Sequence, residues 1–382
     1  MQRKIASTMK HALRWVALAI GILALSPAVD AQEPYKIGGV LCTSGPFAAV
    51  GIDEMRGAQL AVKNVNAAGG VNGRKLELIA EDDQGRADLS VIRANKLVSQ
   101  DKVSAIIACY GAGAVAYAEM LQKAEVPLFG IIGSAALTQL DNPYIFRSAL
   151  GDPTILEGIT DLIRKRGKKR VALIHQSDTM GVGAAAVVIK AASAKGYEIV
   201  ADEGFAVQAN LDLTPQMTRI RAKNPEALVL WAGAPQSIVT LKSMQLLGMK
   251  GVEVYGTPQM TSPSVVAAAA DSEDGTVIIP DVINHANPES EHANFAAAFK
   301  TEYGVPPTTS FAMAGHDSIL LIAEALKNTN GEGAKIKANA EKITNFKGLM
   351  GTYSYSPTHR EGLTASSIKF HAVRGGKLVP VQ

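Results

Sequence analysis

The chain has 382 residues, with 38 Lys and Arg against 35 Asp and Glu and a formal charge of +3. Residues 1–31 hold four of the basic residues and one of the acidic residues, so the remaining chain carries 34 of each. This balance, without a long run of like charge, argues against a nucleic-acid-binding protein. The length exceeds what one hydrophobic core usually supports, so two domains are expected.

The first segment is typical of a secretory signal peptide. Basic residues, among them Arg3 and Lys4, precede an apolar run over residues 15–25, and small residues lead up to Ala31. The apolar run is about half of the roughly 20 residues that a membrane-spanning helix needs. We therefore predict that residues 1–31 are a signal peptide, cleaved after Ala31, and that the mature chain is exported, soluble and unanchored.

Two cysteines are too few for a disulfide scaffold, although an oxidising compartment permits one bond. Cys42 and Cys109 each end an apolar run, which could bring them to neighbouring strands. A disulfide and a buried pair of free thiols are both consistent with this position. Of the two, we expect the buried pair of free thiols.

Short apolar runs alternate with helical segments through most of the chain. The predicted strands are residues 36–41, 75–80, 105–108, 127–131, 170–174, 197–205, 227–230, 252–256 and 276–279. The predicted helices between them are residues 56–66, 88–98, 115–124, 154–166, 183–195, 213–222 and 236–247. After Pro280 two helices, at residues 291–302 and 311–328, precede a β-rich tail. This order predicts an α/β fold of two lobes, each a parallel sheet flanked by helices, with the first four strands in one lobe and the next five in the other.

Four predicted strand ends consist largely of small or polar residues: residues 42–46, 109–113, 132–135 and 175–178. Parallel sheets bind ligands beyond the carboxyl ends of their strands, where helix N-termini present free N–H groups. Gly111, Ala112 and Gly133 let a ligand approach the backbone. Ser44 and Ser134 add hydroxyl groups. Such a set of donors suits a carboxylate.

Enzyme signatures are absent from the sequence. It contains no phosphate-binding loop, no Gly-x-Ser-x-Gly elbow and no His-Glu-x-x-His motif. Ser99 and Lys102 match the Ser-x-x-Lys pattern, but they stand in the charged end of a predicted helix, so we interpret the match as a coincidence. His285 and His292 are best explained as residues of a solvated loop that leads into a helix. We predict no catalytic residue, no metal and no cofactor.

Three segments closely resemble the leucine/isoleucine/valine-binding protein family: residues 37–46, 57–62 and 66–73. Further matches are residues 81–84, 94–98, 146–149 and 170–175, so the resemblance extends over nearly all of the mature chain. Proteins of this family are periplasmic solute receptors of ABC importers with the type I binding-protein fold. The resemblance implies the same fold and role here.

The family's chain crosses between its lobes three times, which implies crossings near residues 151–152, 280–281 and 356–357. The implied lobes are residues 32–151 with 281–356, and residues 152–280 with 357–382. The three crossings would form a hinge. A ligand that touches both lobes only when they are closed would favour the closed state.

The resemblance also implies which residues hold a ligand. The family holds the ligand's α-carboxylate with first-lobe loops, at positions that match Gly111, Ala112 and Ser134. It holds the α-amino group with the loop that runs here from Ile132 through Gly133 to Ser134, and with acids, one of which matches Asp152.

Several pocket positions depart from the family's pattern. The family's second acid falls at Gln259, which has no charge, and Val50, Met180 and Ala234 stand where tyrosines are common. A buried ammonium without a carboxylate partner costs at least a few kcal/mol before compensation. The carboxylate end of a ligand is therefore better supported than its amino end.

The expected function is a non-catalytic receptor that binds a small carboxylate-bearing solute, in first place a branched-chain or related amino acid. The alternatives are a receptor for an aromatic or aliphatic acid without an α-amine, and a periplasmic ligand sensor. The expected partners are this solute and an ABC permease in the inner membrane, with no nucleic acid. The protein itself is expected to be a monomer.

Overall fold

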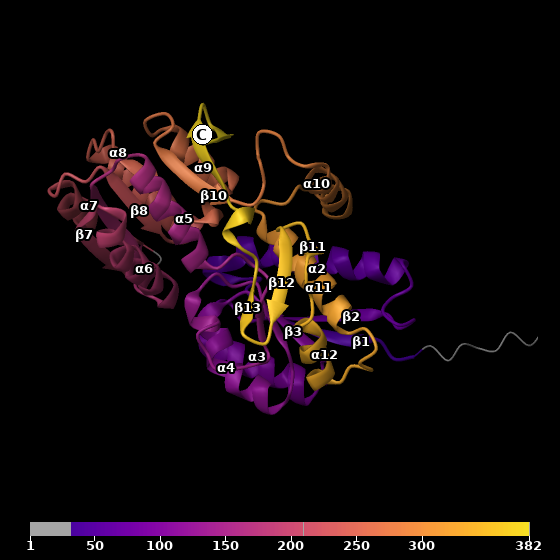
Figure 1. Ribbon diagram of the computed structural model, residues 1–382. Helices are drawn as coiled ribbons and strands as arrows, with labels where there is room; N and C mark the ends of the chain where they lie inside the picture. The colour runs from indigo at the N-terminus through magenta and orange to yellow at the C-terminus, as the bar shows by residue number, and fades with distance from the viewer. Residues whose placement is uncertain (1–31, 209, 382) are drawn as a thin grey trace, which may run out of the picture. The chain divides into compact units, whose positions relative to one another are not determined.

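The computed structural model describes residues 32–208 and 210–381 (Figure 1). Within them, five parallel strands form a first sheet in the order β2-β1-β3-β4-β5. Their bounds are β1 Tyr35–Leu41, β2 Leu76–Asp82, β3 Ala105–Ala108, β4 Leu128–Gly130 and β5 Ile145–Arg147. These strands are rich in Ile, Leu, Val and Ala, as is usual for strands covered on both faces.

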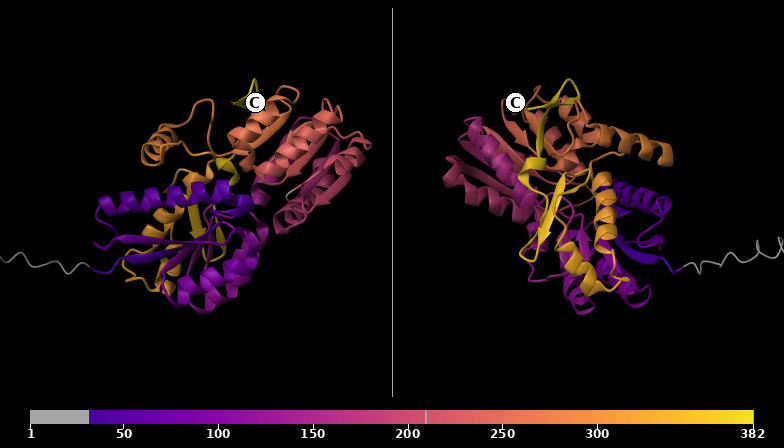
Figure 2. Two further views of the ribbon diagram at one scale, coloured as in Figure 1. Left: turned by 180° about the vertical axis from the view of Figure 1, so that it is seen from behind. Right: turned by 45° about the vertical axis from the view of Figure 1, so that its right-hand side comes forward.

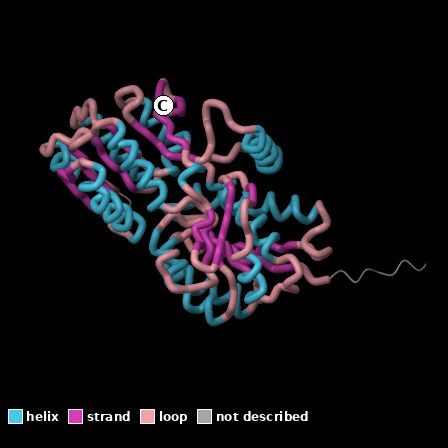
Figure 3. The backbone as a smooth tube through the Cα atoms, in the orientation of Figure 1, coloured by secondary structure: helices cyan, strands magenta, loops and turns pink. Residues whose placement is uncertain are grey.

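A second sheet has the order β15-β14-β10-β9-β8-β6-β7. Its parallel strands are β6 Arg170–Gln176, β7 Glu198–Phe205, β8 Ala227–Trp231, β9 Glu253–Tyr255 and β10 Val277–Asp281. The antiparallel strands β14 Lys369–Arg374 and β15 Lys377–Pro380 extend it beyond β10. Figure 3 shows helices on either side of each parallel sheet.

A small antiparallel sheet, β11-β12-β13, packs beside the first sheet. Its strands are β11 Phe346–Lys347, β12 Thr352–Ser356 and β13 His359–Gly362. The Tyr353 and Tyr355 hydroxyls donate to the carbonyls of Ser148 and Arg147 at 2.8 and 2.7 Å. The chain joins the second sheet only at β14, so we propose that the third crossing follows Gly362.

Helices cover both sheets. Those beside the first sheet are α2 Ala48–Ala67, α3 Ala87–Ser99, α4 Gly111–Lys123, α10 Ser290–Tyr303, α11 Phe311–Ala325 and α12 Gly333–Ala340. Those beside the second are α5 Asp152–Lys165, α6 Thr179–Lys195, α7 Thr214–Arg221, α8 Ala234–Leu246 and α9 Pro263–Ala270. Short 3₁₀ turns are η1 Gly45–Phe47, η2 Ala135–Leu137, η3 Pro258–Thr261 and η4 Ala365–Ser367.

The segment after β10 returns to the first sheet, where α11 lies alongside α2 (Figure 2). The two helices approach closely at glycines. A Cβ at Gly57 would lie 1.8 Å from the Ala312 carbonyl oxygen, and a Cβ at Gly315 would lie 2.1 Å from that of Glu54. This contact places the N-terminus of α11 and the Glu54 side chain next to the same cavity.

All nine predicted strands match strands of the two sheets, and β5 is an additional one. Several helices begin earlier than predicted: α2 begins at Ala48, eight residues early, and α4 and α6 begin at Gly111 and Thr179, four residues early. Among the described residues, no helix is both long enough and apolar enough to cross a membrane. The predicted signal peptide, residues 1–31, lies outside the described residues.

Candidate functional site

A cavity lies at the carboxyl ends of strands from both sheets. It has a volume of about 110 Å³. A buried cavity of about 150 Å³ holds benzene in another protein, so this volume suits a small ligand. Among the described residues, its lining contains acidic, hydroxyl, amide and apolar side chains but no Lys, Arg or His. Across the cavity, α6 contacts both α4 and η2.

The cavity has two contrasting walls. We call Gly111, Ala112 and Ser134 the first-sheet wall and Asp152, Met180 and Trp231 the second-sheet wall. The first comes from the loops after β3 and β4. The second comes from the starts of α5 and α6 and the end of β8.

Helix α4 presents free backbone donors in the first-sheet wall. Its N-cap residue, Tyr110, makes no side-chain capping hydrogen bond. The N–H of Ala114 donates to the Tyr110 carbonyl at 2.9 Å, which leaves Gly111 and Ala112 without an acceptor inside the helix. Helix α6 differs because Asp178 accepts from the Gly181 N–H at 2.9 Å. The α4 N-terminus is therefore open to an anion.

Four enclosed polar atoms on the cavity lining have no hydrogen-bond partner: Glu54 Oε2, Ser134 Oγ, Asp152 Oδ2 and Trp231 Nε1. Buried polar atoms are nearly always paired, because each unpaired one costs about 1–3 kcal/mol. A bound ligand would supply the missing partners. The set includes donors and acceptors from both walls.

A buried arginine lies behind the first-sheet wall. Arg147 is fully buried and donates to the carbonyls of Gly133 and Ser134, both at 2.8 Å. Its Nη1 is 3.2 Å from a carboxylate oxygen of Glu361 on β13. Burial lowers the pKa of Arg147, and the charge of Glu361 opposes this. An arginine keeps its proton near neutral pH, so this loop has a positive charge beside it.

The acids on the lining differ in protonation. Burial raises the pKa of Glu54 well above its usual range, and Asp53 and Asp83 raise it further. This shift favours the neutral form of Glu54, which can donate a hydrogen bond. Burial raises the pKa of Asp152 to about 6, against the opposing charge of Arg147. Asp152 is therefore mainly a carboxylate at pH 7.

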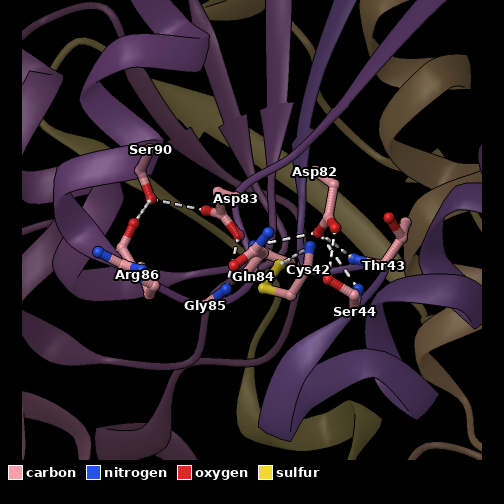
Figure 4. Close-up of a disulfide and its surroundings, with 10 residues drawn as sticks. Cys42, Thr43, Ser44, Asp82, Asp83, Gln84, Gly85, Arg86 and Ser90 are labelled. Atoms are coloured by element: carbon pink, nitrogen blue, oxygen red, sulfur yellow. Dashed lines mark hydrogen bonds between the residues drawn. A yellow bond between two sulfur atoms is a disulfide. The ribbon is translucent and has the colours of Figure 1, made fainter.

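Cys42 and Cys109 form a disulfide that joins the end of β1 to the end of β3, so the expectation of a free pair is wrong. Strands β1 and β3 are paired neighbours, and their parallel register puts both cysteines at one sheet edge. Figure 4 shows the disulfide beside loops held by two acids. Asp82 accepts hydrogen bonds from Thr43 and Ser44, whereas Asp83 accepts from Gly85 and Ser90. Both cysteines line the cavity.

The sequence pattern of the periplasmic binding protein family matches residues 34–372. The chain belongs to the periplasmic binding protein family. Its members are solute-binding proteins of ABC transporters, not enzymes. The two-lobed α/β fold expected from the sequence is confirmed by the parallel sheets and by the solved relatives.

Three similar proteins differ in what they bind. The Leu/Ile/Val-binding protein homolog 7 of Brucella suis biovar 1 (strain 1330) is 24% identical, with 96% of this chain and 95% of the relative aligned. A solute-binding protein of an ABC transporter from Rhodopseudomonas palustris BisB5, solved with 3,4-dihydroxy benzoic acid, is 27% identical, with a TM-score of 0.79 and coverage of 91% and 96%. The branched-chain amino acid transporter substrate binding protein LivJ from Streptococcus pneumoniae str. Canada MDR_19A, solved with isoleucine, is 25% identical, with a TM-score of 0.79 and coverage of 91% and 99%.

Most of the predicted ligand residues of this binding protein line the one cavity. These are Val50, Gly111, Ala112, Ile132, Gly133, Ser134, Asp152, Met180 and Gln259. Ser44 and Ala234 do not line it. Ser44 is hydrogen-bonded to Asp82 through its N–H and hydroxyl, and Ala234 begins α8. That the lining residues contact a ligand stays a prediction.

The sequence analysis missed several lining residues. Glu54 lies within a long helix, and nothing in the sequence distinguishes it from a surface acid. Phe311 and Met350 come from segments far from the other loops in sequence. Trp231 could have been predicted from the sequence as a site residue, because it directly follows the strand predicted at residues 227–230 and so stands at a strand's carboxyl end.

Proposed function

We propose that this binding protein delivers a small organic acid without an α-amine to an ABC permease. The observation that carries the proposal is the open N-terminus of α4 next to the unpaired Ser134 hydroxyl. Backbone N–H groups at a helix start, with the helix dipole, favour a negatively charged group. The charge of Arg147 behind the Gly133–Ser134 loop adds to this preference.

The same loop offers few acceptors to an ammonium group. The Gly133 carbonyl already accepts from the Asp152 N–H at 2.7 Å and from Arg147 at 2.8 Å. The Ser134 carbonyl accepts from Arg147 at 2.8 Å. An ammonium has three donors to satisfy. Asp152 would meet one of them, and the charge of Arg147 would oppose the cation.

A branched-chain amino acid is the second candidate. The similarity to the isoleucine-bound protein of Streptococcus pneumoniae supports it. The position of Asp152 on the lining supports it as well. The protein solved with 3,4-dihydroxy benzoic acid supports the first candidate at similar identity.

The remaining parts of the proposal concern how the protein works in the cell. Residues 1–31 direct export to the periplasm, and the mature protein acts as a monomer. Crossings near residues 151 and 281 and after Gly362 form the hinge. A solute that bridges the two walls stabilises the closed arrangement, which the permease recognises.

A thermal-unfolding screen of the mature protein tests the carboxylate. The probes are benzoate, 3,4-dihydroxybenzoate, isoleucine and methyl benzoate, which keeps the ring but lacks the charge. At 100 times its dissociation constant a ligand stabilises by about 2.7 kcal/mol. We expect the organic acids to raise the transition temperature and the ester to leave it unchanged. A shift with isoleucine and none with the acids would favour the second candidate, and an equal shift with the ester would contradict the carboxylate site.

A further inference from the structure

The second-sheet wall contains an unpaired donor and an unpaired acceptor. Trp231 Nε1 and Asp152 Oδ2 are both enclosed, and neither has a hydrogen-bond partner. They come from different elements, since Trp231 ends β8 and Asp152 begins α5. An indole nitrogen only donates, and an ionised carboxylate only accepts. A ligand at this wall must therefore supply an acceptor for Trp231 and a donor for Asp152.

The two groups lie close enough to interact. Burial and Arg147 have the largest effects on the pKa of Asp152, and the nearby Trp231 side chain lowers it further. Trp231 Nε1 and Asp152 Oδ2 nevertheless have no hydrogen-bond partner among the described residues. A single ligand group that contacts both must accept from Trp231 and donate to Asp152. A hydroxyl does both, an ammonium only donates and a carboxylate only accepts.

We propose that Asp152 and Trp231 form a hydroxyl-binding subsite, so that the solute is a hydroxylated organic acid. This inference rests on the proposed function, because it takes the solute's carboxylate to occupy the first-sheet wall. The hydroxyl then lies at the opposite wall. The ligand touches both sheets only when the cavity is closed.

The other acids on the lining cannot take this role. Asp178 accepts from the Gly181 N–H and from Gln176 at 2.9 and 3.0 Å. Asp281 accepts from the Val282 N–H at 2.7 Å and is 2.6 Å from His285 Nε2. Glu54 lies on α2, beside the first sheet, and its raised pKa favours the neutral form, which can donate. Asp152 is therefore the acid of the second-sheet wall with an unused acceptor.

Calorimetric titration of the mature protein with benzoate and with 2-, 3- and 4-hydroxybenzoate tests the subsite. A site built to bind a hydroxyl rejects the analogue that lacks it, because its own polar groups stay unpaired. We expect at least one hydroxybenzoate to bind ~10-fold more tightly than benzoate or better. Trp231→Phe removes the donor and keeps an aromatic ring. It should reduce this preference to about threefold or less while benzoate affinity changes little.

Asp152→Asn provides a second variant, and Asp161→Asn a matched control. Asp161 lies on the same helix, outside the cavity, and pairs with Lys195. The Asp152 variant should lower the hydroxyl preference, because a neutral acceptor binds a hydroxyl less strongly than a carboxylate. The Asp161 variant should keep the full preference.

Four results would overturn the proposal. Equal affinity for benzoate and every hydroxybenzoate, or a preference that survives both variants, refutes the subsite and leaves the carboxylate site intact. Tight isoleucine binding that is lost in Asp152→Asn would make Asp152 an ammonium partner instead. No binding of any acid refutes the proposed function, and the subsite with it.

Discussion

The two walls of the cavity recognise a ligand by different means. The first-sheet wall offers backbone N–H groups at Gly111 and Ala112 and one small hydroxyl at Ser134. The second-sheet wall offers the side chains of Asp152 and Trp231. A side-chain substitution leaves backbone donors in place but changes side-chain chemistry completely. The first wall is therefore suited to bind the carboxylate that a class of solutes shares. The second wall is suited to distinguish solutes that differ in their other groups.

The supports of the two walls differ as well. The disulfide and Arg147 hold the loops of the first-sheet wall from behind. Among the described residues, the second-sheet wall has no disulfide, and its two central polar atoms are unpaired. We therefore predict that damage to the first wall costs stability and general affinity. Damage to the second should mainly change which solute binds.

Removing the disulfide should have the largest effect. Cys42 and Cys109 are 67 residues apart in sequence. The loop-entropy model gives about 4 kcal/mol for a loop of this size, as an upper value. We expect the double variant Cys42→Ala, Cys109→Ala to lose about 2–4 kcal/mol in denaturant unfolding and to bind acids more weakly. A reductant should destabilise the wild type but not the variant. A loss below about 1 kcal/mol would show that the first wall does not depend on this bond.

Replacing the buried arginine should have the next largest effect. Arg147→Met keeps the apolar stem but removes the Arg147 donor from both carbonyls, so that Ser134 loses it and Gly133 keeps only the Asp152 N–H. We expect a loss of about 3 kcal/mol in stability and at least ~10-fold in affinity for the acid. Arg219→Met is the control, because Arg219 forms an exposed pair with Glu203, worth under about 1 kcal/mol. Equal losses in the two variants would contradict the role of Arg147.

The pKa of Asp152 predicts a pH dependence of stability. Because burial raises this pKa to about 6, the folded protein holds a proton that the unfolded chain releases near pH 4. The protonated group stabilises the fold at low pH, and this contribution is lost as pH rises through about 6. Between about pH 4 and pH 7 the wild type should lose about 2 kcal/mol relative to Asp152→Asn. Urea unfolding of both proteins measures this, and parallel curves over that range would refute it.

Ser134→Ala should have the smallest effect, confined to binding. The Ser134 hydroxyl has no partner, so its removal should leave stability nearly unchanged. Affinity for the acid should fall by about 1 kcal/mol, or roughly fivefold. Ser44→Ala is the opposite control, since Ser44 bonds Asp82 away from the cavity and should lower stability only. If Ser134→Ala leaves affinity unchanged, its hydroxyl does not contact the solute.

The sequence was sufficient for the order of strands and helices but not for where the helices at the site begin. Helix α4 was expected to start at residue 115 and starts at Gly111, and α6 was expected at 183 and starts at Thr179. The first turn of α4 is Gly-Ala-Gly-Ala, and the start of α6 contains Gly181 and Gly183, so neither start shows a clear apolar periodicity. Small residues make a helix start hard to predict from the sequence, and they also let a ligand approach the backbone there.

Contacts between segments distant in sequence explain the rest of what was missed. The bonds from Arg147 to the Gly133–Ser134 loop, and its pairing with Glu361 on β13, depend on how separate strands pack. The bond between Cys42 and Cys109 depends on the pairing of β1 with β3. Strand β5 was missed because it has only three residues and ends in an arginine.

A crystal structure of the protein with its bound solute tests the central claim most directly. We expect the solute's carboxylate oxygens at about 2.7–3.2 Å from the backbone nitrogens of Gly111 and Ala112 and within hydrogen-bond distance of Ser134 Oγ. A carboxylate bound at Trp231 or Gln259, with the α4 N-terminus facing water, would contradict it.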